Sequence, residues 1–483
     1  MRILHVASEC YPLIKTGGLA DVVAALPPAQ ALLGADARLL LPGYPAVLDG
    51  LADARRIRHL PDPWTGGTAR LVHGTTPAGV ACYAVEAPEL FGRPGNPYVD
   101  PFGRDWPDNH RRFALLGWVA AWLAGPGGGP RWRPDIVHGH DWQAGLAPAY
   151  LAHAGGPRPA AVTTIHNIAY QGVFPAGLFD ELHLPPAAFA IDGVEYYGGV
   201  GFLKSGLWHA DRITTVSPSY AAEIRSPGGG MGLEGLLAAR SSDLLGILNG
   251  VDYAVWDPSG DPLLPARYDA DDLSGKAKCK AALQAELGLD VAPEPPLFAV
   301  VTRLTEQKGF DLLLEAAPML LGRGGQLAVL GSGEPWLEDG FRSLAARFPG
   351  RAATVIGYDE ALSHRMQGGA DLIVLPSRSE PCGLVQMFGL RYGTLPLVRR
   401  VGGLADTVVD ADEAALRSGR ATGFTFDDAA PEALSRAIER ALALFRRPGD
   451  WRAVQRHAMS RDFSWAASAT SYLDLYRTLY LEV

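Results

Sequence analysis

Short apolar runs alternate with longer amphipathic stretches along both halves of the chain. Continuous runs of β-branched residues and leucine are typical of parallel strands buried on both faces. Amphipathic stretches such as residues 19–33 and 310–321 are typical of helices. The alternation predicts an α/β protein in which right-handed crossovers connect parallel strands. We expect strands at residues 3–7, 38–41, 135–138, 161–165 and 212–216, and again at residues 297–302, 326–330, 353–356, 371–375 and 395–398.

Segments rich in glycine and proline interrupt this pattern. Residues 125–134 and 155–159 predict surface loops, whereas residues 257–267 and 290–296 separate the two series of strands. A chain of 483 residues is also too long for one ordinary core. We therefore predict two Rossmann-like domains and a C-terminal aromatic helix. This helix could pack back on the first domain, although the sequence alone does not place it. The expected bounds of the two domains and the helix are residues 1–245, 246–460 and 461–483.

The composition narrows the class of protein. Hydrophobic residues make up 48% and charged residues 20% of the sequence, as is typical of a soluble globular protein. The net charge of -9 disfavours nucleic acid as a partner, although a local basic site could still bind a small anion. Four cysteines without close spacing indicate neither a disulfide framework nor a zinc site. We find no signal peptide and no apolar stretch of the roughly 20 residues that span a bilayer, so we expect a cytoplasmic protein without membrane contact.

A glycine pair follows the first predicted strand, in Lys15-Thr16-Gly17-Gly18. Glycines allow close approach to the backbone, and the N-terminus of the next helix offers N–H groups to an anion. The glycine spacings of a dinucleotide fold and of a phosphate-binding P-loop are both absent. The alternative is a tight turn with a solvated lysine. Residues 17–21 recur in sequence at 402–406, which predicts two glycine turns that each begin a helix.

Two candidate sites follow strands of the second half. Arg303 and Lys308 come after the strand at 297–302, and Glu380 and Cys382 come after the strand at 371–375. Ligand sites are expected at the carboxyl ends of parallel strands, where arginine and lysine could neutralise a diphosphate. The segment Glu380–Leu384 then opens a helix. The alternatives are exposed basic residues, a helix-capping glutamate and a small packed cysteine.

Histidines cluster at strand ends of the first half. His138, His140 and Asp141 end one strand, and His166 ends the next. These side chains suit hydrogen bonds to sugar hydroxyls, with Trp142 as a candidate stacking face. A metal site formed by His138, His140 and His166 is an alternative that strand geometry does not exclude, but we expect no metal. Each histidine could also be structural.

Taken together in order, these blocks resemble bacterial glycogen synthases and plant starch synthases, of the two-domain GT-B class of glycosyltransferases. The resemblance runs from Ile3 to about Tyr480 and implies two Rossmann-like domains facing each other across a deep cleft. The blocks are Lys15–Asp21, His140–Gln143, His166-Asn167, Phe202–Lys204, Thr215–Pro218, Ile247–Gly250, Thr302–Leu304, Gln307–Gly309, Pro376–Arg378, Glu380–Leu384 and Gly402–Asp406.

The resemblance implies an activity and a site. The activity is retaining transfer of glucose from ADP-glucose to the non-reducing 4-hydroxyl of an α-1,4-glucan such as glycogen. We expect no cofactor or metal, because no D-x-D-like signature follows a strand and basic residues could neutralise the diphosphate. The implied catalytic residues are Glu380, His166, Arg303 and Lys308. The implied donor-binding residues are Lys15, Gly17, Gly18, Asp21, Asp141, Asn249, Arg303, Lys308, Gly357, Tyr358, Cys382, Gly383 and Leu384.

Two positions depart from the family pattern, and several alternatives stay open. Ser379 stands where relatives often carry a bulky apolar residue, and Gly201 where asparagine is common. A sucrose-type or trehalose-type synthase and a glucan-binding protein with an inactive site are the rival functions. A dehydrogenase is disfavoured because the fingerprint glycines are missing. The sequence does not decide between ADP-glucose and UDP-glucose, nor does it give the oligomeric state.

Overall fold

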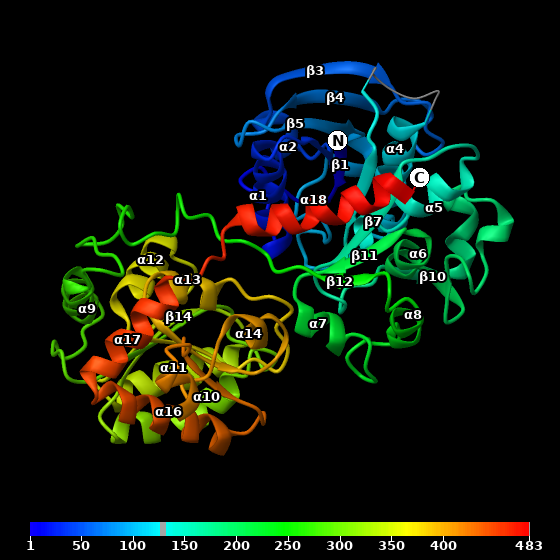
Figure 1. The fold of residues 1–483 in the computed structure, drawn as a ribbon. Coiled ribbons are helices and arrows are strands. Elements are labelled where there is room, and N and C mark those ends of the chain that lie inside the picture. Colours follow the sequence, from blue (N-terminus) through cyan, green and yellow to red (C-terminus); the bar gives the residue numbers. More distant parts are fainter. Residues whose placement is uncertain (126–131, 483) are drawn as a thin grey trace. The chain divides into compact units, whose positions relative to one another are not determined.

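The computed structural model describes residues 1–125 and 132–482 (Figure 1). The chain divides into two compact units, and the first comprises residues 1–250 together with the C-terminal segment from Trp465. The second unit is Val251–Ser464. The divisions therefore follow Gly250 and Ser464, close to the expected positions 245 and 460. Most of the loop expected at residues 125–134 lies outside the described residues.

A nine-stranded sheet forms the centre of the first unit, in the order β12-β11-β7-β6-β1-β2-β5-β4-β3. Neighbouring strands from β12 to β5 pair in parallel, and β4 and β3 extend that edge in antiparallel fashion. The five strands predicted in this half are all present. The bounds are β1 (Arg2–Val6), β2 (Asp36–Pro42), β3 (Ala52–His59), β4 (Arg70–Thr75), β5 (Ala81–Glu86), β6 (Ile136–His140), β7 (Ala160–Ile165), β11 (Arg212–Thr215) and β12 (Leu244–Gly246).

Helices cover this sheet, and a small antiparallel sheet lies apart from it in the order β8-β10-β9. The helix predicted at residues 19–33 is α1, which begins at Gly18 and accommodates Pro27 and Pro28. The small sheet contains β8 (Val173–Pro175), β9 (Glu195–Tyr196) and β10 (Gly199–Gly201). The helices are α1 (Gly18–Leu32), α2 (Pro45–Gly50), α3 (Pro88–Phe91), α4 (Asn109–Ala124), α5 (Ala147–His153), α6 (Phe202–His209), α7 (Pro218–Glu223), α8 (Glu234–Ala239) and α18 (Trp465–Glu482).

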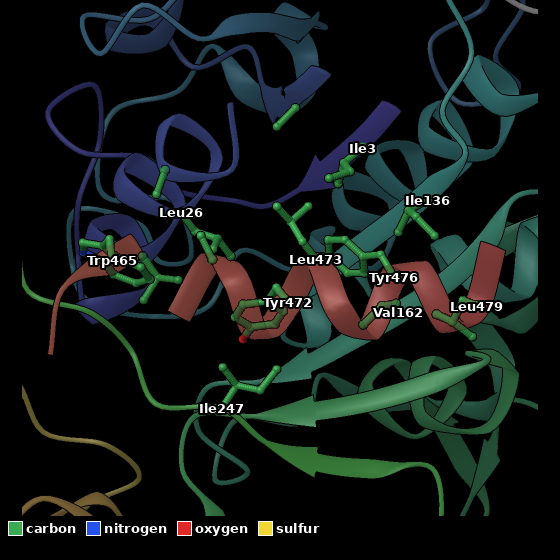
Figure 2. Close-up of a cluster of buried hydrophobic side chains, with 14 of the residues drawn as sticks. Ile3, Leu26, Ile136, Val162, Ile247, Trp465, Tyr472, Leu473, Tyr476 and Leu479 are labelled. Carbon is green, nitrogen blue, oxygen red and sulfur yellow. The ribbon is translucent and has the colours of Figure 1, made fainter. Parts of the chain in front are cut away.

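The C-terminal helix α18 belongs to the first unit. Its apolar face packs on β1, β6, β7 and α1, and Figure 2 shows the buried cluster that results. Burying large aromatic side chains contributes more apolar area than any other residue type, which explains why this helix stays with a unit whose other residues end at Gly250. The helix contributes Trp465, Tyr472, Leu473, Tyr476 and Leu479, and their partners include Ile3, Leu26, Ile136, Val162 and Ile247.

The second unit has a six-stranded parallel sheet in the order β15-β14-β13-β16-β17-β18. Counted within the unit, this is the Rossmann order 3-2-1-4-5-6, whose direction reverses between β13 and β16. The strands are β13 (Leu297–Val301), β14 (Gln326–Gly331), β15 (Ala352–Ile356), β16 (Leu372–Leu375), β17 (Leu395–Arg399) and β18 (Phe424–Phe426). The helices are α9 (Ser274–Glu286), α10 (Phe310–Gly322), α11 (Pro335–Arg347), α12 (Glu360–Gly369), α13 (Val385–Arg391), α14 (Gly402–Thr407), α15 (Glu413–Arg417), α16 (Pro431–Phe445) and α17 (Pro448–Met459).

The recurring glycine motif has the predicted role in both units, because α1 begins at Gly18 and α14 begins at Gly402. Among the described residues, no helix has the length and apolar character needed to cross a bilayer.

Candidate active site

The strand order in the sheet of the first unit also reverses, between β1 and β6. Predicted site residues follow both of these strands. The loop after β1 carries Lys15 and Gly17, and Asp141 directly follows β6. Lys15 Nζ forms an ion pair with Asp21 at 2.8 Å, and both side chains are partly exposed. Structure and sequence therefore agree on where these residues lie relative to the sheet.

Glu9 is a member of this region that the sequence interpretation missed. Its buried carboxylate accepts hydrogen bonds from the backbone N–H groups of Thr16 and Gly17 and from the Tyr98 hydroxyl. The Thr16 hydroxyl also donates to it, at 2.5 Å. Two backbone amides that directly precede α1 are thus already bonded to a carboxylate. The positive charge of the loop comes from the Lys15 side chain.

Asp141 holds an uncommon backbone conformation with φ of 56°. A positive φ is costly for a residue other than glycine and recurs at functional sites. The Asp141 carboxylate accepts a hydrogen bond from the His166 backbone N–H at 2.7 Å. Burial raises the pKa of this carboxyl to about 7. The bond joins the end of β6 to the end of β7 and so positions His166.

Four histidines line up across β1, β6 and β7. His5 Nδ1 lies 3.0 Å from His140 Nε2, and His140 Nδ1 lies 2.9 Å from His166 Nε2. His138 bonds the hydroxyls of Tyr476 at 2.6 Å and Thr164 at 2.5 Å.

The ring nitrogens of His5, His138 and His140 lie close enough together to bind a metal ion. This trio differs from the one considered from sequence, which was His138, His140 and His166. All six ring nitrogens of His5, His138 and His140 already have hydrogen-bond partners. The arrangement therefore fits a hydrogen-bonded core better than a ligand set.

Two further predictions concern the first unit. Asn249 follows β12, and its side-chain oxygen Oδ1 is buried without a hydrogen-bond partner among the described residues. Buried polar atoms in this state are rare and call for a ligand or water. Trp142, by contrast, is not available as a stacking face. It is buried against the rings of Phe113, Phe174 and Phe202.

In the second unit the two expected strand ends bring a cation and a carboxylate together. Lys308 Nζ lies 2.5 Å from Glu380 Oε2, and the Ser377 hydroxyl donates to the same oxygen at 3.2 Å. Lys308 follows β13 and Glu380 follows β16, the two strands that flank the reversal of strand order. Arg303 is exposed and forms neither a hydrogen bond nor an ion pair with any described residue. Its guanidinium is thus available to an anion.

Close backbone packing fixes the loops of this unit. Gly309 has φ of 72°, and a Cβ there would lie 2.0 Å from the Pro376 carbonyl oxygen. A Cβ on Gly403 would lie 2.1 Å from the Cys382 carbonyl oxygen. These glycines hold the segments of Lys308 and Glu380 against their neighbours, because no larger residue fits.

The remaining predicted positions of this unit follow β16 and the edge strand β15. Cys382 is buried, in line with a packed residue, and Gly383 and Leu384 directly precede α13 as expected. Gly357 follows β15 with φ of 129°. The ring of Tyr358 is 81% exposed, and its hydroxyl donates to Glu360 at 2.7 Å. The exposed Tyr358 ring thus lies directly after β15, at the edge of the sheet.

Known proteins resemble the chain over its whole length. Residues 2–239 match the family described as starch synthase catalytic domain, and residues 288–453 match the family described as glycosyl transferases group 1. A glycogen synthase from Serratia proteamaculans (strain 568) is 56% identical over 99% of this chain and 100% of its own. A glycogen synthase from Paramagnetospirillum magneticum (strain ATCC 700264 / AMB-1) is 51% identical over 99% of this chain and 98% of its own.

Solved structures give the same picture. The catalytic domain of starch synthase IV from Arabidopsis thaliana, bound to ADP and acarbose, has a TM-score of 0.85 at 33% identity and covers 99% of both chains. A sucrose-phosphate synthase from Thermosynechococcus elongatus has a TM-score of 0.58 at 19% identity over 100% of both chains, which indicates a shared fold. The chain therefore belongs to the glycogen and starch synthase family of GT-B glycosyltransferases.

Proposed function

We propose that the protein transfers glucose from ADP-glucose to the non-reducing 4-hydroxyl of an α-1,4-glucan, with retention of the α configuration. The observation that carries this proposal is the group at the ends of β13 and β16, where exposed Arg303 accompanies the Lys308–Glu380 ion pair. Support also comes from the glycogen synthase relatives and from the ADP that the Arabidopsis structure binds.

The charges suit departure of a diphosphate. As the bond to the anomeric carbon breaks, negative charge grows on the leaving group, and only interactions that strengthen with this charge accelerate the reaction. Arg303 and Lys308 are the groups that would meet it, since a guanidinium can bind two phosphate oxygens at once. Lys15 of the first unit is assigned to the same donor. These cations occur in a chain whose net charge is -9, so the attraction must be local.

Glu380 has a positioning and stabilising role in this proposal. Its Oε2 already accepts from Lys308 and Ser377, which favours a fixed carboxylate over a nucleophile. A retaining glycosidase uses two carboxyl groups about 5 Å apart, one of which attacks the sugar. We propose instead a displacement on one face, in which the departing phosphate helps to deprotonate the incoming 4-hydroxyl. The backbone carbonyl of His166 would stabilise the positive charge that develops on the sugar.

Side-by-side transfer assays test this function. The protein is incubated with glycogen and radiolabelled ADP-glucose or UDP-glucose, and label in the polymer is counted. We expect incorporation from ADP-glucose to exceed that from UDP-glucose. Fructose 6-phosphate and glucose 6-phosphate serve as small-acceptor controls. Transfer to either sugar phosphate without transfer to glycogen would reject the proposal, and glycogen binding without ADP release would indicate a binding protein.

A further inference from the structure

A continuous line of hydrogen bonds leads from helix α1 to His166. On α1, Gln30 Oε1 lies 2.8 Å from His5 Nε2. His5 Nδ1 lies 3.0 Å from His140 Nε2, and His140 Nδ1 lies 2.9 Å from His166 Nε2. The line crosses three neighbouring strands of the parallel sheet, and each imidazole uses both of its ring nitrogens except the last.

These imidazoles are neutral. Burial lowers the pKa of His5 to about 4 and that of His166 to about 3, and it lowers the pKa of His140 well below the usual value. A neutral imidazole has one N–H and one bare nitrogen. In a line of such rings, a donor at one end therefore fixes which nitrogen carries the proton in every ring that follows.

Tyr476 of α18 sets the direction of this line. Its hydroxyl lies 2.6 Å from His138 Nδ1 and 3.5 Å from Gln30 Nε2. A phenol has a single proton, so when Tyr476 donates it to His138 its oxygen accepts from the amide of Gln30. Gln30 then presents its carbonyl oxygen to His5, and His5 must carry its proton on Nε2.

The proton positions of the other rings follow. With the His5 proton on Nε2, His5 Nδ1 would be bare and accept from His140 Nε2, and His140 Nδ1 would in turn accept from His166 Nε2. His166 is left with a bare Nδ1. That atom is buried and has no hydrogen-bond partner among the described residues. An unpaired buried acceptor is costly unless a ligand supplies a donor.

We propose that Gln30, His5 and His140 are positioning residues that hold the His166 proton on Nε2, so that Nδ1 accepts a hydrogen bond from a hydroxyl of the donor sugar. The sugar part of this inference rests on the proposed function, whereas the proton position does not. Because a bare His166 Nδ1 is an acceptor, it would bind a ligand hydroxyl, which can donate a hydrogen bond, rather than a carbonyl oxygen, which cannot. The aromatic helix α18 thereby acquires a role in the site through Tyr476.

Nitrogen NMR of histidine side chains tests the proton position in the ligand-free protein. Shifts of the two ring nitrogens distinguish a protonated from a bare nitrogen, and loss of a signal in His166→Gln assigns the ring. We expect neutral His166 with its proton on Nε2 from pH 6 to pH 8. A proton on Nδ1, a charged ring, or rapid exchange between both forms would overturn the proposal.

Substitution of Gln30 tests the origin of the effect. Gln30→Met keeps the length of the side chain but removes both polar groups, so we expect His166 to populate both neutral forms. Tyr476→Phe should loosen the preference in the same direction. Tyr472→Phe is the matched control, since Tyr472 is buried one turn away on α18 and is outside the Gln30–His5–His140–His166 line. An unchanged His166 spectrum in Gln30→Met would reject the relay.

Donor analogues link the proton position to catalysis. ADP-glucose derivatives that each lack one hydroxyl are compared as substrates of the wild type and of Gln30→Met. We expect one derivative to lose about tenfold or more in kcat/KM with the wild type, and this penalty to shrink in the variant. An equal penalty in both proteins would overturn the sugar contact. Inactivity with ADP-glucose itself would instead refute the proposed function while leaving the NMR result intact.

Discussion

At the scale of single residues, Arg303 provides the most direct test of the charge argument. It is exposed and has no bond to another described residue, so its removal should disturb the fold little. Arg303→Ala should lower kcat/KM for ADP-glucose by about 100-fold to 1000-fold, by analogy with loss of one oxyanion-stabilising donor. Arg342→Ala is the control, because Arg342 is also exposed but pairs with Asp339 on α11. Wild-type turnover of Arg303→Ala at saturating donor would contradict the assignment.

Lys308 and Glu380 should behave as a coupled pair. Glu380 is buried, and removal of Lys308 leaves its charge without the ion partner 2.5 Å away. Lys308→Met should therefore lower stability by about 3 kcal/mol, in addition to its effect on catalysis. The double variant with Glu380→Gln should recover much of the stability but none of the activity. Denaturant unfolding of both singles and the double measures the coupling, and additive losses would argue against the pair.

Asp141 predicts a pH dependence of stability. Burial raises the pKa of its carboxyl from 3.8 to about 7, so the folded protein holds this proton more tightly than the unfolded chain. The protonated Asp141 carboxyl makes its full contribution to the free energy of unfolding below about pH 4. This contribution is lost as the pH rises through about 7, at roughly 1.4 kcal/mol per pKa unit. Asp141→Asn should remove this loss. The free energies of unfolding of the variant and the wild type are measured in urea at pH 5 and pH 8. The value for the variant should rise relative to that of the wild type at pH 8, and a difference that is the same at both pH values would disprove the role of burial.

Candidate site residues at strand ends could be predicted from the sequence, whereas the buried residues that hydrogen-bond to them or to their loops could not. Lys308 and Glu380 were identified because parallel strands place their carboxyl ends at one edge of a sheet. Glu9 and Gln30 act through contacts with residues that no local periodicity connects to them. A signal did exist for His5, since it is a polar residue inside an apolar strand run and needs a buried partner.

At the scale of elements, sequence reasoning succeeded for buried strands whose sequences are runs of β-branched residues and leucine. The run at 161–165 became β7, which is buried along its whole length. The edge strand β3 was missed because it is exposed at every position and gives no apolar run. The next strands in the sheet, β4 and β5, were missed although they are largely buried, since neither contains a continuous run of β-branched residues and leucine. The place of α18 was left open for a related reason. Its aromatic face shows that it packs, but the surface that receives it is assembled from β1, β6, β7 and α1.

The anchorage of α18 can be tested at Gly250. A Cβ at this position would lie 2.5 Å from the Trp465 Cα, and a backbone atom cannot move aside as a side chain can. Gly250→Ala should therefore cost about 1–3 kcal/mol of stability through overpacking. At Gly177 an added Cβ meets nothing within 4 Å, so Gly177→Ala is the control. Equal unfolding midpoints for the two variants would show that the start of α18 is not held in this way.

At the scale of the whole molecule, each unit carries candidate donor-binding cations although the net charge of the protein is -9. Lys15 lies in the first unit, and Arg303 and Lys308 lie in the second. Each follows a strand that flanks the reversal of its own sheet. In each unit, therefore, a basic residue follows a strand beside the reversal of strand order, although the two sheets differ in strand number and in their edges.

This distribution predicts that catalysis does not depend on a divalent metal. A diphosphate leaving group must be neutralised, and metal-dependent transferases do so with a bound cation. Here the guanidinium of Arg303 and the ammonium of Lys308 are assigned that charge, so activity should be unchanged after exhaustive treatment with EDTA. The measurement is glucosyl transfer before and after chelation, with a magnesium-dependent hexokinase treated in parallel as control. Loss of activity that Mg²⁺ restores would show that the basic residues are insufficient and that the charge argument built on them is wrong.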